Sequence, residues 1–185
     1  MVLPIVAYGD PILRKRAEDI TKDYPGLQQL IDDMFETMER AKGVGLAAPQ
    51  INKSIRLFVV DSDKMYDDDE PGEGIREVFI NAQILDESGK EWAFEEGCLS
   101  IPGIREDVYR EEKIVIKYLD RDFKQHQKTF DGMTARVIQH EYDHIEGKLF
   151  IDHLKPLKKS LLKSRLDKIT KGIVSVDYKM RFPKV

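Results

Sequence analysis

The stretch Gln139-His140-Glu141-Tyr142-Asp143-His144 contains the pattern His-Glu-x-x-His. On an α-helix, residues four apart lie about 40° apart around the axis and about 6 Å apart along it, so both imidazoles can bind one metal ion from the same face. Glu141 follows the first histidine, where it can exchange a proton with water beside the metal rather than bind the metal itself. The stretch therefore predicts a metal-binding helix that also carries a general base.

The flanking residues favour a helix over about Thr134–Glu146. Asp131-Gly132 precedes it, Gly147 follows it, and apolar residues recur at helical spacing inside it, at Ala135, Val137, Ile138 and Ile145. The alternative is a helix whose His and Glu serve only packing and solvation. From average composition the pattern arises by chance in about one chain in a hundred or fewer. The metal-binding interpretation is therefore preferred.

Composition places the chain among ordinary globular proteins. Its 185 residues are enough for one domain, 1–185, with a real hydrophobic core, and 41% hydrophobic with 35% charged residues fits a soluble protein. There is no apolar run of 18 residues and no signal-peptide pattern, so no membrane partner is expected. The single cysteine, Cys98, excludes an internal disulfide. These features predict a cytoplasmic protein.

Charge is distributed unevenly along the chain. Residues 1–150 hold 20 Lys/Arg against 31 Asp/Glu, a net charge of −11, whereas residues 151–185 hold 10 against 3, a net charge of +7. The acidic run Asp67-Asp68-Asp69-Glu70-Pro71-Gly72 predicts a solvated loop. The basic C-terminal extension, about 155–185, could contact an anionic partner such as RNA; the alternative is a solvated helix face. No DNA partner is expected.

The remaining pattern mixes helices and strands without a regular βαβ rhythm. Pro25–Lys42 predicts an amphipathic helix with Gly43 just past its end. Predicted strands are Ile55–Asp61, Glu77–Leu85, Lys113–Asp120 and Lys124–Phe130, the last two joined by a hairpin turn at Asp120-Arg121-Asp122. Extended Lys148–Ile151, a helix at Pro156–Lys171 and extended Ile173–Phe182 follow. We therefore expect a single α+β domain, with mixed or antiparallel strands packed around the metal-binding helix and helices near both ends.

Two histidines leave a catalytic metal under-coordinated, because such a centre normally has three protein ligands plus water. Downstream, His153 and the later acids form no familiar spacing, and His126, in the predicted hairpin, is interpreted as a surface residue. Upstream, Glu95–Ser100 places Cys98 in a short extended segment. A thiolate binds Fe(II) or Zn(II) well. The alternative, a buried free cysteine acting as a small hydrophobe, is favoured when Cys98 is taken alone.

Residues 43–50, Gly-Val-Gly-Leu-Ala-Ala-Pro-Gln, form a third notable segment. It has no lysine and is not a phosphate-binding loop, nor does it match the dinucleotide fingerprint. A helix C-cap followed by a turn would explain Gly43. That alternative leaves Gly45, the alanine pair and Gln50 without a reason.

Together, these three segments resemble the signature motifs of the peptide deformylase family. Gly-Val-Gly-Leu-Ala-Ala-Pro-Gln, Glu-Gly-Cys-Leu-Ser and Gln-His-Glu-Tyr-Asp-His occur in the family's order, and the similarity runs from about Pro4 to Leu154. One small departure is Ile145, where many members have leucine. The family removes the N-formyl group from the initiator methionine of nascent bacterial-type polypeptides and releases formate.

The resemblance implies a role for each motif residue. Cys98, His140 and His144 would bind one divalent metal, usually Fe(II), with Zn(II), Ni(II) or Co(II) as possible substitutes. Glu141 would move the proton of the attacking water, and Gln50 and the backbone N–H of Leu99 would donate to the oxyanion. The peptide-binding residues would be Val44, Gly45 and Gly97 through the backbone, Val44, Met133, Val137 and His140 around the methionine, and Arg105 near the peptide. For Arg105 an ordinary surface charge is the alternative.

Two rival functions differ in class. A metalloprotease would also use His-Glu-x-x-His, but it needs neither the cysteine segment nor Gln50. A non-catalytic binder with a structural metal would need four closed ligands, which this chain does not obviously supply. Some members of the family dock on the ribosome through a C-terminal helix. Here Pro156–Lys171 could do so through its basic residues, Lys158, Lys159, Lys163, Arg165 and Lys168.

Overall fold

Five antiparallel strands in the order β2–β3–β4–β5–β6 form the main sheet of the computed structural model, which describes residues 1–66 and 72–184. These strands are β2 (Gly45–Ala47), β3 (Leu57–Asp61), β4 (Arg76–Cys98), β5 (Ile101–Leu119) and β6 (Gln125–Asp131). The α+β class predicted from the sequence is confirmed. The predicted acidic loop, residues 67–72, lies outside the described residues except for Gly72.

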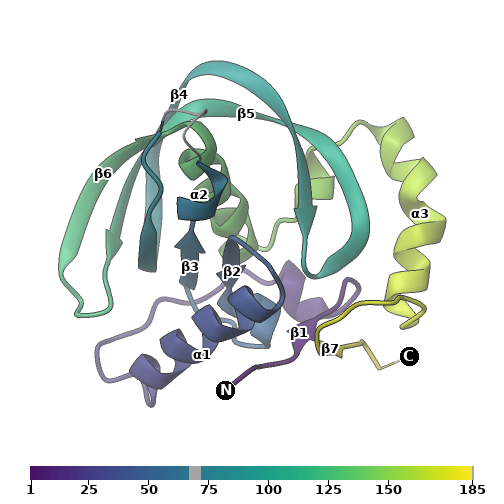
Figure 1. Ribbon diagram of the computed structural model, residues 1–185, viewed down its shortest axis with the longest axis horizontal. Helices are drawn as coiled ribbons and strands as arrows, with labels where there is room; N and C mark the ends of the chain where they lie inside the picture. The colour runs from purple at the N-terminus through teal and green to yellow at the C-terminus, as the bar shows by residue number, and fades with distance from the viewer. Residues whose placement is uncertain (67–71, 185) are drawn as a thin grey trace.

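The core is divided by β3, whose side chains alternate between its two faces. Leu57 and Val59 pack in one hydrophobic cluster and Phe58 and Val60 in another, as the two-residue period of a strand requires. The first cluster includes the buried face of α1 (Leu27–Arg40) and the second that of α2 (Gly132–Ile145). The sheet therefore holds α2 between its strands and the arched β4–β5 ribbon, with α1 on the opposite side (Figure 1).

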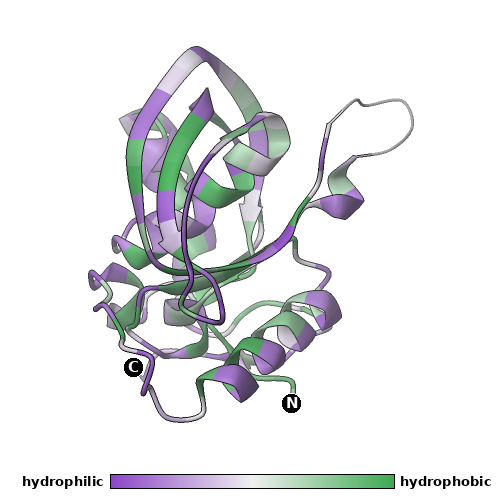
Figure 2. Cartoon of the chain, turned by 90° about the vertical axis from the view of Figure 1, so that its left-hand side faces the viewer, coloured by the Kyte–Doolittle hydropathy of each residue, from purple (hydrophilic) through white to green (hydrophobic). Residues whose placement is uncertain are grey.

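Helix α1 ends slightly differently from the prediction. The residue with a left-handed backbone is Lys42, at φ 57°, whereas Gly43 donates its N–H to the Met38 carbonyl at 2.8 Å. Gly43 is small for another reason: a Cβ there would lie 2.9 Å from the side chain of Leu99. Polar and apolar residues alternate in short runs along α1, the helix next to the N-terminus in Figure 2, as expected for a helix with one buried face.

Strands β4 and β5 are much longer than predicted. β4 continues from the predicted end at Leu85 to Cys98, and β5 begins at Ile101 rather than Lys113. Their outer halves pair with each other through several register shifts and bend into the ribbon over α2 in Figure 1. The turn between β5 and β6 confirms the predicted hairpin. The outer ribbon was missed because most side chains of residues 85–95 are exposed, which removes the apolar alternation.

The chain ends converge below the sheet. β1 (Ile5–Val6) pairs in parallel with β7 (Met180–Arg181), so residues 173–182 are regular strand only over two residues, less than predicted. Residues 150–153 form a 3₁₀ helix, η4 (Phe150–His153), where an extended piece was predicted. The helix α3 (Pro156–Thr170) packs Leu162, Leu166 and Ile169 against a third cluster. The other short 3₁₀ helices are η1 (Pro11–Arg14), η2 (Ala48–Ile51) and η3 (Asp63–Met65).

No helix in residues 1–66 or 72–184 is both long and apolar enough to cross a bilayer.

Candidate metal centre and active site

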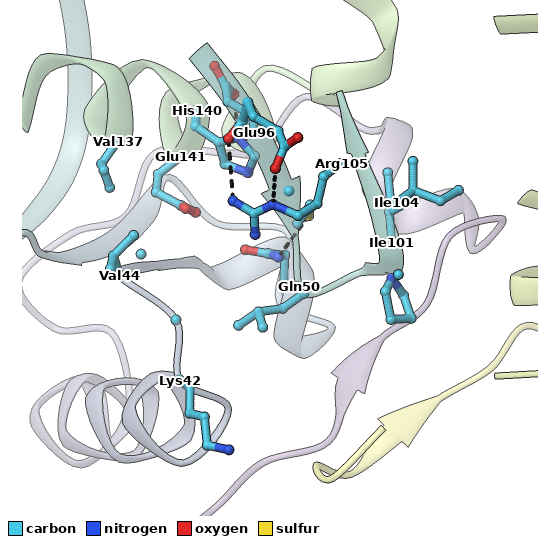
Figure 3. Close-up of a pocket in the computed structure, with 18 of the residues that line it drawn as sticks. Lys42, Val44, Gln50, Glu96, Ile101, Ile104, Arg105, Val137, His140 and Glu141 are labelled. Atoms are coloured by element: carbon cyan, nitrogen blue, oxygen red, sulfur yellow. Dashed lines mark hydrogen bonds and ion pairs between the residues drawn. The ribbon is translucent and has the colours of Figure 1, made fainter. Parts of the chain in front are cut away.

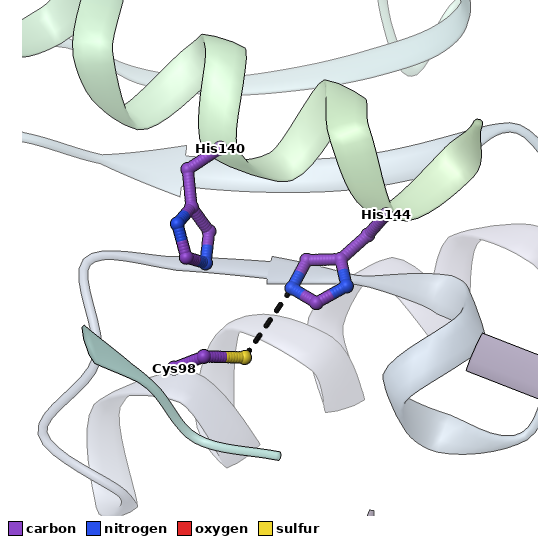
Figure 4. A group of neighbouring side chains, drawn as sticks. All are labelled: Cys98, His140 and His144. Carbon is purple, nitrogen blue, oxygen red and sulfur yellow. Dashed lines mark hydrogen bonds between the residues drawn. The ribbon is translucent and has the colours of Figure 1, made fainter. Parts of the chain in front are cut away.

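Three predicted ligands meet where α2 passes the end of β4. The ligand atoms of Cys98, His140 and His144 all lie within 4.8 Å of one another, and the two imidazoles extend from α2 toward the thiol (Figure 4). Cys98 Sγ lies 3.4 Å from His144 Nε2. Sulfur and nitrogen ligands of a tetrahedral zinc-type ion are separated by about 3.6 Å, given the usual bond lengths. The residues therefore fit a divalent cation without rearrangement of this pair.

Glu96 fixes the orientation of His140. Its carboxylate accepts from His140 Nδ1 at 2.9 Å, from two nitrogens of Arg110 at 2.8 and 3.0 Å, and from Arg136 at 2.7 Å. Although burial opposes ionisation, the hydrogen bonds from His140 and Arg110 hold the pKa of Glu96 well below its usual range. With Nδ1 donating to Glu96, the neutral ring of His140 would have the lone pair of Nε2 available for a metal.

A buried charge network continues from Glu96 to the surface. Arg110 also donates to Asp143 at 2.9 Å, and Asp143 pairs with His153 at 2.8 Å. No role was predicted from the sequence for Glu96, Arg110 or Arg136. Two spacings could have indicated Glu96 and Arg136: Glu96 shares a strand face with Cys98, and Arg136 precedes His140 by one helical turn. The long sequence separation of Arg110 gave no such signal.

The surroundings of Cys98 favour the thiolate form of its side chain. Burial raises the pKa of its thiol, but the attraction of His144 and the hydrogen bonds from both histidines outweigh this and lower the pKa to about 5. A thiolate is the form that binds metals. The alternative of an inert core cysteine is disfavoured, because such a thiol would have a raised pKa.

Glu141 lies buried beside the two histidines, 4% exposed, and its Oε2 has no hydrogen-bond partner among the described residues. Burial raises the pKa of its carboxyl to about 7 despite the opposing charges of His140 and His144. The side chain lies against Gly45, where a Cβ would overlap the carboxylate. Gly45 is therefore needed to make room for Glu141, a reason that the sequence did not reveal.

Gln50 lies on η2 rather than on a loop, and its amide has a defined orientation. The backbone N–H of Ala47 donates to Gln50 Oε1 at 2.9 Å, which turns the Nε2 group toward Ser100 Oγ at 3.2 Å and Cys98 Sγ at 3.5 Å. Because a backbone N–H can only donate, the oxygen must face Ala47. The amide donor therefore faces the candidate metal centre.

A cavity of about 840 Å³ opens beside the metal ligands (Figure 3). All but one of the predicted site residues line it, namely Val44, Gly45, Gln50, Gly97, Cys98, Leu99, Arg105, Met133, Val137, His140 and Glu141. The exception, His144, is buried and does not line the cavity. Arg105 crosses the front of the cavity in Figure 3, where its Nε donates to Glu95 at 3.0 Å.

Other residues line the cavity without having been predicted. They include Lys42, Met65, Phe94 and a stretch of the C-terminal segment, Ser175–Tyr178. His126, interpreted from the sequence as a surface residue, is partly buried: it hydrogen-bonds Asp120 at 2.7 Å and stacks on Tyr118. His126 lies outside the metal-ligand group.

This site defines a metal-dependent hydrolase: a His-Glu-x-x-His helix, a thiolate and a buried carboxylate converge at one end of an open cavity. The sequence profile of the family described as polypeptide deformylase matches residues 2–160. The chain belongs to this family, and it is an enzyme that removes the N-formyl group from nascent polypeptides.

Other peptide deformylases match this chain in sequence and structure over nearly its full length. The peptide deformylases of Christiangramia forsetii and Cytophaga hutchinsonii are each 56% identical to 99% of this chain, which corresponds to 97% and 98% of those proteins. A crystal structure of the peptide deformylase from Legionella pneumophila superimposes with a TM-score of 0.79 at 42% identity, covering 94% of this chain and 98% of that one. The rival metalloprotease and structural-metal functions are thereby disfavoured.

Proposed function

We propose specific roles for the site residues in the deformylation reaction. The observation that carries the proposal is that the Glu141 carboxylate, the Gln50 amide and the ligand atoms of Cys98 and His140 line one cavity. A divalent ion held by Cys98, His140 and His144 would supply a Lewis acid that makes water more acidic and stabilises developing negative charge.

Glu141 is the proton carrier of this proposal. Its carboxylate accepts a proton from the attacking water and later delivers it to the amine that leaves with the peptide. The raised pKa, about 7, suits a group that must both accept and release a proton near neutral pH. Because its free oxygen has no other partner among the described residues, the water would meet no competitor there.

Gln50 and the backbone N–H of Leu99 would stabilise the oxyanion that forms as water adds to the formyl carbon. The fixed orientation of the Gln50 amide supports this role, because a donor that is already in place costs no reorganisation during the reaction. Backbone groups of Val44, Gly45 and Gly97 would pair with the peptide as a further strand. Val44, Met133, Val137 and the His140 ring would surround the methionine side chain, and Arg105 would lie near the peptide.

Replacing Gln50 by leucine tests the oxyanion proposal. The variant should keep its metal but lose about 10²–10³-fold in kcat, because one preorganised donor is removed. The measurement is formate release from a formyl-Met peptide together with metal content. Gln127→Leu, at an exposed position on β6, is the matched control and should retain normal kcat. A folded, metal-loaded Gln50→Leu enzyme with wild-type kcat would contradict the role.

For the metal we propose Fe(II), on the strength of the family resemblance. A thiolate and two imidazoles also accept Zn(II), Ni(II) or Co(II), and this donor set alone does not select among them. For localisation we propose the bacterial cytoplasm, where nascent formylated chains arise.

We also propose that α3 contacts the ribosome through an exposed basic surface. Two of the basic residues predicted for this role are already engaged, Lys158 with Glu106 at 3.0 Å and Arg165 with the Gly103 carbonyl. The docking surface is therefore assigned to Lys159, Lys163 and Lys168, which are all exposed. Removing residues 156–185 would be a poor test, because Leu162, Leu166 and Ile169 belong to the core.

Charge reversal at these three lysines gives a cleaner experiment. The triple Lys→Glu variant should no longer co-sediment with ribosomes at low salt, because contacts with phosphate depend on net positive charge. Its formate release from a free peptide should be unchanged. Co-sedimentation equal to that of the wild type would contradict the docking surface.

A further inference from the structure

The C-terminal segment reaches back to the active site. Residues 175–178 line the cavity although they lie beyond residue 160, where the match to the family profile ends. Within this segment Tyr178 is partly buried, and its phenol donates to the backbone carbonyl of Leu99 at 2.8 Å. This contact links the last part of the chain to the turn that follows Cys98.

That turn needs partners from outside the sheet. Leu99 and Ser100 are the two residues between paired Cys98 and Ile101, so their carbonyls lie beyond the end of the β4–β5 ladder. The Ser100 carbonyl accepts from the N–H of Tyr8 at 2.8 Å, and the Leu99 carbonyl accepts from Tyr178. Each turn carbonyl is thus held by a segment near one end of the chain.

Tyr178 is itself held in place on both sides. Asp177 pairs with Lys42, which follows the end of α1, at 3.1 Å, and both residues line the cavity. On the other side, the backbone carbonyl of Lys179 accepts from the N–H of Ile5 at 2.9 Å, next to the β1–β7 pairing. The ring packs against the first hydrophobic cluster. Burial and then the negative charge of Cys98 raise the pKa of the phenol to about 12. At neutral pH the phenol is protonated, as an ordinary tyrosine is, and can donate this hydrogen bond.

We infer that Tyr178 is a positioning residue for deformylation: by fixing the Leu99 carbonyl, its hydroxyl sets the orientation of the turn that carries the Leu99 N–H. The inference rests on the proposed role of that N–H as an oxyanion donor. The carbonyl and the N–H of Leu99 lie in two planar peptide units that are separated only by the φ and ψ angles of Leu99. Because Cys98, before the turn, is paired with Ile101 in the ladder, a fixed Leu99 carbonyl leaves fewer orientations open to the Leu99 N–H. Oxyanion donors act through exact placement, and a shift of about 1 Å can cost about 100-fold in rate.

Tyr178→Phe removes the hydroxyl and keeps the ring. We expect kcat for a formyl-Met peptide to fall about tenfold, with KM and metal content unchanged, because the turn is loosened rather than displaced. In the zinc-loaded protein labelled with ¹⁵N-leucine, the amide signal of Leu99 should shift or broaden. Tyr109→Phe, at an exposed tyrosine on β5, is the control and should change neither kcat nor the Leu99 signal.

Three results would overturn the inference. Wild-type kcat with an unmoved Leu99 signal would show that the hydrogen bond positions nothing. A raised KM with unchanged kcat would make Tyr178 a substrate contact instead. A moved Leu99 signal with unchanged kcat would remove the oxyanion role of Leu99 and, with it, the positioning role of Tyr178. Gln50 and Glu141 are tested by their own variants, so their roles stand or fall separately.

Discussion

Glu141→Gln should lower kcat for formate release by about 10²–10⁴-fold while leaving the metal in place. Glutamine has nearly the same shape as glutamate, so it can occupy the space beside Gly45, yet it cannot accept and return a proton. The carboxylate is not among the three grouped ligands, which is why metal content should not change. The measurements are kcat with a formyl-Met tripeptide and the metal content of the same sample.

The control for this variant is Glu91→Gln, on the exposed outer part of β4. It removes the same charge without touching the cavity and should leave kcat unchanged. The combination of full metal content, native fold and near-normal kcat in Glu141→Gln would show that another group carries the proton. A loss of metal together with kcat would instead place Glu141 among the ligands.

The central elements of the fold lie close to their predicted ranges because their apolar residues are distinctive. Helices α1 and α2 each bury one face at helical spacing, and β3 is a short continuous apolar run that is buried on both faces. The outer β4–β5 ribbon could not be predicted in this way. Residues 86–91 are exposed, and their pairing with β5 depends on backbone hydrogen bonds, which leave no residue pattern.

The site residues also differ in how far the sequence alone could identify them. Short-range spacing identified His140, Glu141 and His144, because one helical turn brings them together. Cys98 and Gln50 could be linked to them only through the family resemblance, since their proximity depends on tertiary packing. The partners Arg110 and Tyr178 were not predicted at all: each reaches the site from a distant segment, and neither belongs to a recognisable motif.

Cys98→Ala should abolish stable metal binding and, with it, formate release. Alanine leaves two imidazoles at the site, and the removed thiolate supplied the only negative charge among the three grouped ligands. Loss of a residue that only hydrogen-bonds a metal ligand typically weakens metal affinity about 10–100-fold. The loss of a ligand itself should weaken metal affinity by more than this. Metal content after dialysis, and affinity measured against a competing chelator, would give the size of the effect.

His126→Ala is the matched control, because it removes an imidazole that lies outside the ligand group and should leave metal content unchanged. The thermal midpoint of Cys98→Ala must be compared in chelator with that of the wild type, so that loss of metal is separated from loss of fold. If Cys98→Ala retained its full metal content after dialysis, the thiolate would not be a ligand. The thiolate that His140 and His144 favour would then serve another purpose, such as accepting the hydrogen bond from the Gln50 amide.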